Sequence, residues 1–159
     1  MNTIKTILFI LVVPGSVLII IPINLILPME QNAIRLGALS WLALPFWITG
    51  SAILLWCALD FVRKGHGTPA PVDAPKSLVV NGLYRFVRNP MYVGVLLFAI
   101  GDAIWFGSPL LGGYALLLWI TFHLFVLLYE EPHLGKIFGE TYQEYRKDVP
   151  RWVPRLRRG

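Results

Sequence analysis

The sequence predicts an all-α, polytopic membrane protein with four transmembrane helices and a cytoplasmic amphipathic helix at its C-terminal end. Of the 159 residues, 56% are hydrophobic and only 14% are charged, whereas soluble domains average about 25% charged residues. The hydrophobic residues are grouped in blocks, which so short a chain cannot bury in one soluble core. The single cysteine, Cys57, excludes a framework of disulfides. We therefore expect a single integral-membrane domain over residues 1–159.

The first two transmembrane helices are expected at residues 7–27 and 39–62, because a bilayer core requires about 20 apolar residues per helix. The first segment contains no charged residue, and Pro14 and Pro22 predict a kink within it. It is too long for the apolar core of a signal peptide and is not followed by a cleavage site and a polar region.

The third and fourth transmembrane helices are expected at residues 91–106 and 109–129. No acidic or basic residue interrupts residues 103–129, and the sequence Gly-Ser-Pro at 107–109 is a turn signal. The third helix is short for a span, which predicts little tilt or a locally thin bilayer. Because the turn is tight, the two helices form a hairpin whose cytoplasmic ends are expected to be neighbours.

The basic residues predict the orientation of these helices. All of the 14 Lys and Arg residues except Arg35 lie near the N-terminus, in the loop of residues 63–90 or in the tail of residues 130–159. The positive-inside rule therefore places both termini in the cytoplasm, which is compatible with the inner membrane of a prokaryote. The net charge of +5 indicates a lipid bilayer as partner, not a nucleic acid, because no basic stripe stands apart from a membrane edge.

The tail begins with a predicted helix over residues 130–147. Its apolar side chains recur at helical spacing and line one face, so we expect it to lie along the membrane interface or to fold back over the loop. Pro132 suits the first turn of a new helix and is expected to bend it away from the last span. The apolar face consists of Leu134, Ile137, Phe138, Tyr142 and Tyr145.

Two polar clusters are expected to meet at the cytoplasmic ends of the hairpin. One is residues 76–92, which lead into the third span, and the other is residues 130–133, directly after the fourth. Their arginines can bind a carboxylate or phosphate, their glutamates an ammonium, and their tyrosine rings a base or a sulfonium. S-adenosylmethionine carries such groups, although many other ligands do as well. The side chains concerned are Tyr84, Arg85, Arg88, Tyr92, Glu130 and Glu131.

Structural roles compete with binding roles at these positions. Arginines and tyrosines near span ends are about as often interfacial anchors as binding residues. A purely structural role explains the two glutamates less well, because acidic residues at the end of a span do not help to set the orientation of the protein in the membrane.

Ionisable residues within the spans are functional candidates by default. Asp60 and Asp102 fall in this class, but Asp102 is expected to reach water at the outer end of its helix. His123 is expected to be a hydrogen-bonded packing residue. His66 and His133 have no partners at metal-ligand spacing, so no metal is predicted.

Two sequence blocks carry a family resemblance. The first is Leu78-Val79-x-x-Gly82-x-Tyr84-x-x-x-Arg88-Asn89-Pro90-x-Tyr92-x-Gly94. The second is Glu130-Glu131-x-x-Leu134, then Phe138-Gly139-x-x-Tyr142-x-x-Tyr145, followed by Pro150 and Pro154. In order and spacing the blocks resemble the membrane methyltransferases of the isoprenylcysteine carboxyl methyltransferase and phospholipid N-methyltransferase superfamily. The resemblance covers residues 60–156, whereas the first two spans are not diagnostic.

The resemblance implies an enzyme that uses S-adenosylmethionine, releases S-adenosylhomocysteine and methylates a lipophilic acceptor entering sideways from the bilayer. The C-terminal helix would close over the cofactor, and Glu130 would hold the methionine ammonium. Carried over position by position, cofactor contacts fall on Lys76, Ser77, Leu78, Val79, Tyr84, Asn89, Pro90, Met91, Tyr92 and Glu130.

Two departures from the family pattern bear on the acceptor. The carboxyl methyltransferases usually have histidine at the position of Asn89, and their eukaryotic members have arginine at the position of Val126. The acceptor therefore stays open between a prenylated or other lipophilic carboxylate, a phospholipid amine and a small thiol. An amine must first lose a proton, and Glu131 is the candidate base for that case. Arg88 is the second residue predicted to be catalytic.

Two functions of other classes compete with a methyltransferase. A non-catalytic protein that binds lipid head groups could use the same basic loop, but it has no need for the paired glutamates. A small transporter is disfavoured, because only His123 and Asn24 are polar near the middle of the spans.

Overall fold

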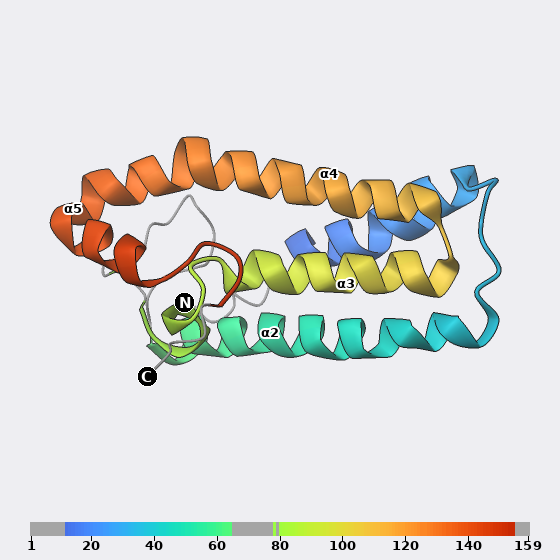
Figure 1. The fold of residues 1–159 in the computed structure, drawn as a ribbon, viewed down its shortest axis with the longest axis horizontal. Coiled ribbons are helices and arrows are strands. Elements are labelled where there is room, and N and C mark those ends of the chain that lie inside the picture. The colour runs from blue at the N-terminus through green and yellow to red at the C-terminus, as the bar shows by residue number, and fades with distance from the viewer. Residues whose placement is uncertain (1–11, 65–77, 79, 155–159) are drawn as a thin grey trace.

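The computed structural model describes residues 12–64, 78 and 80–154, and every regular element among them is helical (Figure 1). The predicted all-α class is therefore confirmed for this part of the chain. In chain order the elements are η1 (Ser16–Ile20), η2 (Pro22–Ile26), η3 (Leu27–Met29), η4 (Gly37–Leu42), α2 (Ala43–Lys64), η5 (Gly82–Arg85), α3 (Pro90–Phe106), α4 (Pro109–Phe125), η6 (Val126–Glu130) and α5 (Glu131–Asp148).

The long helices form a bundle in which α3 lies between α2 and α4 (Figure 1). The N-terminal helical segment packs against α3 and α4, where the Tyr114 hydroxyl donates a hydrogen bond to the Val17 carbonyl over 2.9 Å. One apolar core joins the N-terminal segment to all three long helices. Its buried members are Leu18, Leu54, Val95, Ala99 and Ala115.

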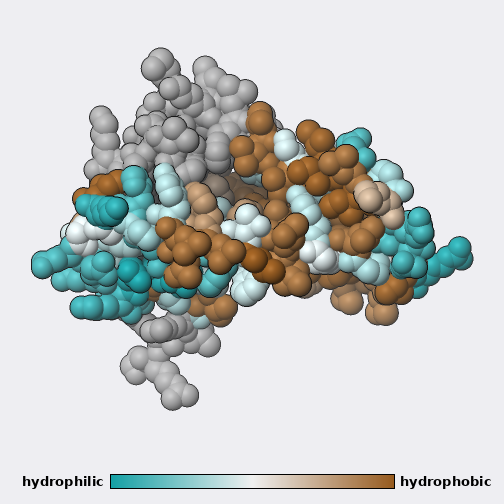
Figure 2. Space-filling view, turned by 90° about the horizontal axis from the view of Figure 1, so that it is seen from above, coloured by the Kyte–Doolittle hydropathy of each residue, from teal (hydrophilic) through white to brown (hydrophobic). Residues whose placement is uncertain are grey.

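Within the part of the chain that the structure describes, three helical segments are long and apolar enough to cross a membrane, namely Val12–Met29, Gly37–Asp60 and Pro109–Asp148. They contain most of the first, second and fourth predicted spans. The third, α3, is apolar but has 17 residues, fewer than the roughly 20 of a typical span, so a fourth crossing stays a prediction. Hydrophobic side chains cover the middle of the face in Figure 2, and hydrophilic ones gather at its two ends. This distribution suits a molecule embedded across a bilayer.

The predicted hairpin between the last two long helices is confirmed. Helix α3 ends at Phe106 and α4 begins at Pro109, and the Ser108 hydroxyl caps α4 by accepting a hydrogen bond from the Leu111 N–H over 3.1 Å. Ser108 also donates a hydrogen bond to the Glu30 carboxylate, and this bond holds the pKa of Glu30 below its usual value. The N-terminal segment is thus tied to the turn of the hairpin.

The C-terminal helix bends at a different residue from the one expected. The chain stays helical from α4 through the π-helical turn η6 into α5, in which Pro132 is the second residue. The helical geometry breaks instead at Gly139, with φ 53° and ψ −128°, a region of backbone space open mainly to glycine. Figure 1 shows the chain reversing within α5, so that its last turns point back toward α3. Pro132 lies in the first turn of α5, as expected, whereas the reversal of the chain lies at Gly139.

Helices α2 and α3 approach each other closely at two glycines. A Cβ atom placed on Gly50 would lie 2.7 Å from the Gly94 carbonyl oxygen, and one on Gly94 would lie 3.1 Å from the Gly50 carbonyl oxygen. Small residues allow two backbones to touch in this way. The contact fixes α3 against α2 and so sets where the start of α3 lies.

Asp102 does not reach water as expected, because it faces α2 rather than the outer surface. Asp102 is only 6% exposed, and the Trp47 indole N–H donates a hydrogen bond to Asp102 Oδ1 over 2.9 Å. Trp47 in turn packs against Trp105, with ring centroids 5.3 Å apart. Asp102 therefore has a structural role between α2 and α3.

The Asp102→Asn variant is expected to keep the stability and activity of the wild type, because the amide oxygen still accepts the bond from Trp47. Asp102→Leu is expected to lower the free energy of unfolding by about 1–3 kcal/mol, since it leaves the indole N–H buried without an acceptor. Thermal unfolding of both purified variants in detergent tests the difference. An equal loss in Asp102→Asn would show that the charge, and not the hydrogen bond, matters here.

Candidate active site

The hairpin brings the two predicted polar clusters together at the end of the bundle that carries α5, which we call the polar end. Tyr92 lies in the first turn of α3, and its hydroxyl donates a hydrogen bond to Glu130 Oε2 over 3.2 Å. Glu130 is the last residue of η6. This contact between residues far apart in the sequence confirms that the clusters meet.

The segment that leads into α3 is held by the C-terminal segment, residues 145–152. The backbone N–H of Arg88 donates a hydrogen bond to the Pro150 carbonyl over 2.9 Å. The side-chain amide of Asn89 donates one to the Arg151 carbonyl over 3.2 Å. The Tyr145 hydroxyl donates to the carbonyl of Tyr84 over 2.7 Å. The C-terminal segment therefore runs across the start of α3.

A set of packed rings, which we call the aromatic wall, lines the same region and consists of Tyr92, Trp119, Phe122, His123 and Trp152. The Tyr92 ring stacks on Phe122 with centroids 4.7 Å apart and lies 6.5 Å from the Trp152 ring. The Trp152 indole N–H donates to His123 Nδ1 over 3.2 Å, and the His123 ring stacks on Trp119 at 5.5 Å. The expectation that His123 is a hydrogen-bonded packing residue is confirmed.

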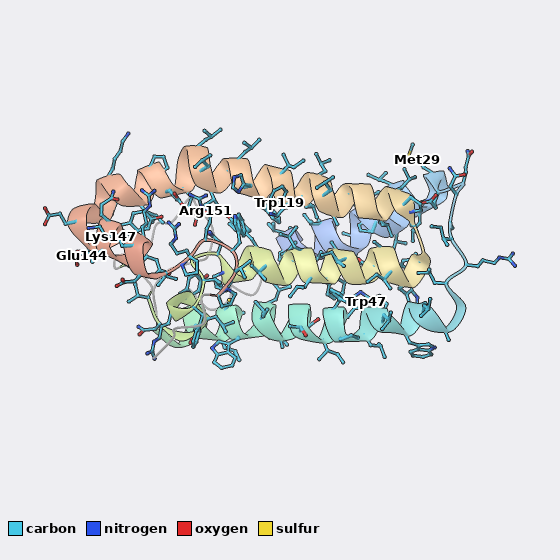
Figure 3. All side chains as sticks on the ribbon, viewed as in Figure 1. Met29, Trp47, Trp119, Glu144, Lys147 and Arg151 are labelled. Carbon is cyan, nitrogen blue, oxygen red and sulfur yellow. The ribbon has the colours of Figure 1, made fainter. Side chains whose placement is uncertain are left out.

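Glu131 is 4% exposed and lies among arginines. Arg151 binds it with two nitrogens, over 2.7 and 2.9 Å, and Arg88 and Arg146 contact it over 2.9 and 3.4 Å. The hydrogen bond to Glu131 raises the pKa of Arg151 above its usual value, so this guanidinium stays charged. Figure 3 shows Arg151 inside the polar end, with Glu144 and Lys147 at its outer edge.

The two neighbouring glutamates therefore have different surroundings. Glu130 faces the phenol of Tyr92, which occupies one of the roughly four lone-pair positions of a carboxylate. Glu131 faces three guanidinium groups. A carboxylate beside tyrosine rings can accept hydrogen bonds from a ligand's ammonium group, while the ring faces attract a sulfonium.

Among the predicted cofactor residues that the structure describes, Tyr84 and Tyr92 lie near Glu130. Asn89 and Pro90 are buried, and the Asn89 side chain contacts the C-terminal segment. Leu78 is half-buried, and Met91 packs against the apolar core. Lys76, Ser77 and Val79 lie outside the described residues.

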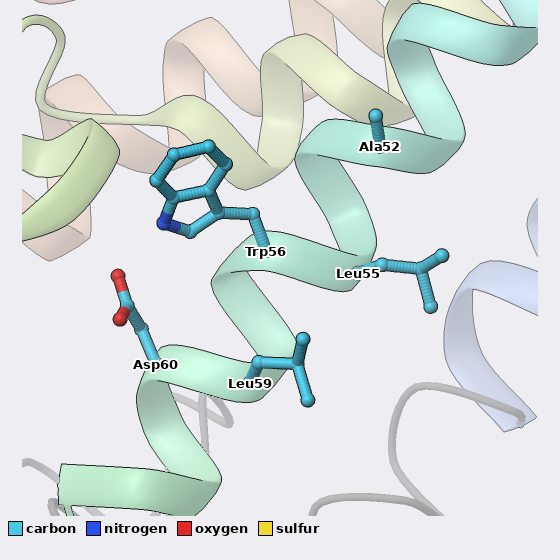
Figure 4. Close-up of a pocket in the computed structure, with 5 residues that line it drawn as sticks. All are labelled: Ala52, Leu55, Trp56, Leu59 and Asp60. Atoms are coloured by element: carbon cyan, nitrogen blue, oxygen red, sulfur yellow. The ribbon is translucent and has the colours of Figure 1, made fainter.

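Asp60 lies at the edge of the same region, near the end of α2. It ends a shallow groove on that helix and points, like Trp56, toward Gly82 of η5 (Figure 4). The other residues that line the groove are Ala52, Leu55 and Leu59.

The sequence reasoning missed the contribution of the C-terminal segment. Arg151 and Trp152 lie between the two prolines of the second family block, Pro150 and Pro154. A proline-flanked segment after a helix is extended, which was the available signal that these side chains could reach across the site. Their partners lie 20 to 62 residues away in the sequence, so no local pattern identifies them.

Comparison with known proteins gives a family model and several relatives. The model of the phospholipid methyltransferase family matches residues 38–141. The protein-S-isoprenylcysteine O-methyltransferase of Homo sapiens is 38% identical over 119 residues, which cover 68% of this chain and 42% of the human protein. The enzyme of the same name from Schizosaccharomyces pombe is 40% identical over 80 residues, covering 48% and 33%. Protein-S-isoprenylcysteine O-methyltransferase A of Arabidopsis thaliana is 26% identical over 120 residues, covering 69% and 60%. The chain thus spans at most 60% of the length of these relatives.

Proposed function

The chain belongs to the phospholipid methyltransferase family, and on this basis we propose that it transfers the methyl group of S-adenosylmethionine to a lipophilic acceptor in a membrane. The observation that carries the proposal is the hydrogen bond between Tyr92 and Glu130 under the C-terminal segment. It joins the two family blocks into one polar site beside the apolar helices.

The residues present at the polar end suit this cofactor. Glu130 supplies a negative charge for an ammonium group, and the rings of Tyr84 and Tyr92 supply faces for a sulfonium. When bound, S-adenosylmethionine supplies a methyl group activated by the positive sulfur. Glu130 and Asn89 hold and orient the ligand, and the aromatic wall with Trp152 excludes water from the reacting atoms.

We propose a lipophilic carboxylate as the acceptor, of the class named for the relatives, an isoprenylcysteine. A carboxylate is already an anion at neutral pH and requires no general base. The arrangement of Glu131 supports this choice, because its ion pairs with three arginines make it a poor base for an amine. A phospholipid amine and a small thiol are the alternatives.

We further propose that α3 completes a four-span topology with both termini and the polar end in the cytoplasm. The basic residues support this orientation, since Arg85, Arg88 and Arg151 lie at the polar end while Arg35 precedes η4 at the opposite end of α2. The inner membrane of a prokaryote stays a prediction from the sequence.

Incubating membranes that contain the protein with methyl-labelled S-adenosylmethionine tests the proposed reaction. We expect label in the organic extract, released as a volatile product by base because a methyl ester is base-labile. Label that resists base and stays in phospholipid would identify an amine acceptor instead. Membranes containing the Glu130→Ala variant serve as control, and equal labelling from both preparations would contradict the proposal.

A further inference from the structure

Glu131 is the centre of a charge cluster formed with Arg88, Arg146 and Arg151, which we call the arginine cluster. Oε1 lies 2.7 Å from Arg151 Nε and 2.9 Å from Arg88 Nη1. Oε2 lies 2.9 Å from Arg151 Nη2 and 3.4 Å from Arg146 Nη2. The two contacts from Arg151 are hydrogen bonds, and those from Arg88 and Arg146 are ion pairs, so each oxygen of the carboxylate has two guanidinium nitrogens within 3.4 Å.

The arginine cluster joins three segments that meet at the site. Arg88 directly precedes the start of α3, Glu131 begins α5, and Arg151 belongs to the C-terminal segment. Backbone contacts reinforce the junction, because residues 88 and 89 donate hydrogen bonds to the carbonyls of residues 150 and 151. The side chain of Arg88 is only 10% exposed, so neutralising Glu131 would leave a buried guanidinium without its counter-charge.

The junction also determines where the aromatic wall lies. Trp152 directly follows Arg151, and its ring packs 6.5 Å from that of Tyr92 while its N–H binds His123. Tyr92 in turn donates to Glu130. A chain of contacts thus leads from Glu131 through Arg151 and Trp152 to the residues proposed to bind the cofactor.

We propose that Glu131 is a positioning residue that holds the C-terminal segment over the cofactor site, and that it is not the base that accepts a proton from the acceptor. The inference rests on the proposed function of the same site. A carboxylate that binds three guanidinium groups has little basicity to offer, whereas its ion pairs fix the relative positions of the three segments.

The test compares the purified full-length wild type with Glu131→Gln, Arg151→Ala and Arg151→Lys. We expect Glu131→Gln and Arg151→Ala each to weaken the binding of S-adenosylhomocysteine by about tenfold or more and to raise KM for S-adenosylmethionine to a similar extent. The shape of the pH profile of kcat should not change. Arg151→Lys should recover part of the affinity, because one donor and the charge remain. The double variant Glu131→Gln/Arg151→Ala should bind S-adenosylhomocysteine only slightly more weakly than the weaker-binding of its two single variants, because both changes disrupt the same arginine cluster.

Arg146→Gln and Lys147→Gln cover the possibility that the first variants fail to fold. Arg146 contributes one longer contact and is 37% exposed, so its replacement should weaken S-adenosylhomocysteine binding a few-fold without leaving a buried charge. Lys147 is its exposed neighbour on α5, and Lys147→Gln should bind as the wild type does.

Two results would overturn the inference. The first is that Glu131→Gln binds S-adenosylhomocysteine with wild-type affinity, while the pH profile of its kcat no longer shows the titration of a basic group. Glu131 would then be the base. The other is a set of Glu131 and arginine variants that all bind as the wild type does. If the wild type itself binds no S-adenosylhomocysteine, the proposed function fails instead.

Discussion

The Glu130→Gln variant is expected to lose measurable affinity for S-adenosylhomocysteine and to lose methyl transfer. Glutamine keeps the shape of the side chain and an oxygen that can accept the hydrogen bond from Tyr92, so the change removes mainly the negative charge. Removing one partner of a desolvated, hydrogen-bonded charge pair costs about 2–5 kcal/mol, which corresponds to an affinity loss of at least about 30-fold.

Isothermal titration of the purified variants measures this loss directly. Glu144→Gln is the matched control, because Glu144 is an exposed carboxylate on α5 at the outer edge of the polar end (Figure 3). We expect Glu144→Gln to bind as the wild type does, and Glu130→Ala to fail as Glu130→Gln does. Unchanged affinity in both Glu130 variants would show that the ammonium group binds elsewhere.

The Gly50→Ala variant is expected to destabilise the bundle and to weaken ligand binding as a consequence. The new methyl group would lie 2.7 Å from a backbone oxygen of Gly94 and 3.0 Å from the backbone nitrogen of Phe98. Because these atoms belong to α3 itself, the two helices must move apart, and such overpacking costs about 1–3 kcal/mol.

Gly112→Ala provides the matched control for this variant. Gly112 lies on an exposed face of α4, and a Cβ atom there meets no atom within 4 Å. Replacing glycine with alanine inside a helix gains up to about 1 kcal/mol, so Gly112→Ala should raise the unfolding temperature while Gly50→Ala lowers it. If both variants raise the unfolding temperature, α2 and α3 are not in close contact at Gly50.

Local signals in the sequence were sufficient for the helices and for the hairpin. Pro90 and Pro109 mark the first residues of α3 and α4, and the run of residues 103–129, which has no acidic or basic residue and is interrupted by Gly-Ser-Pro at 107–109, predicted an apolar hairpin. The hairpin then required both polar clusters to meet, as the contact of Tyr92 with Glu130 confirms. These features depend on backbone chemistry within a few residues, which a sequence shows directly.

Features that depend on contacts across the fold could not be predicted in the same way. Glu130 and Glu131 are adjacent in the sequence, but successive side chains of a helix point about 100° apart, so one faces Tyr92 and the other faces arginines. The sequence does not show which face meets which partner. Asp102 was misplaced for the same reason, because its partner Trp47 lies 55 residues away.

The most direct test of the central claim is the titration of S-adenosylhomocysteine into the purified, full-length wild-type protein. The site at Glu130 predicts saturable binding of one ligand per chain, which the Glu130→Gln variant lacks and the Glu144→Gln variant retains. A wild-type protein that stays folded in detergent, as its thermal unfolding shows, but releases no heat of binding would contradict the account.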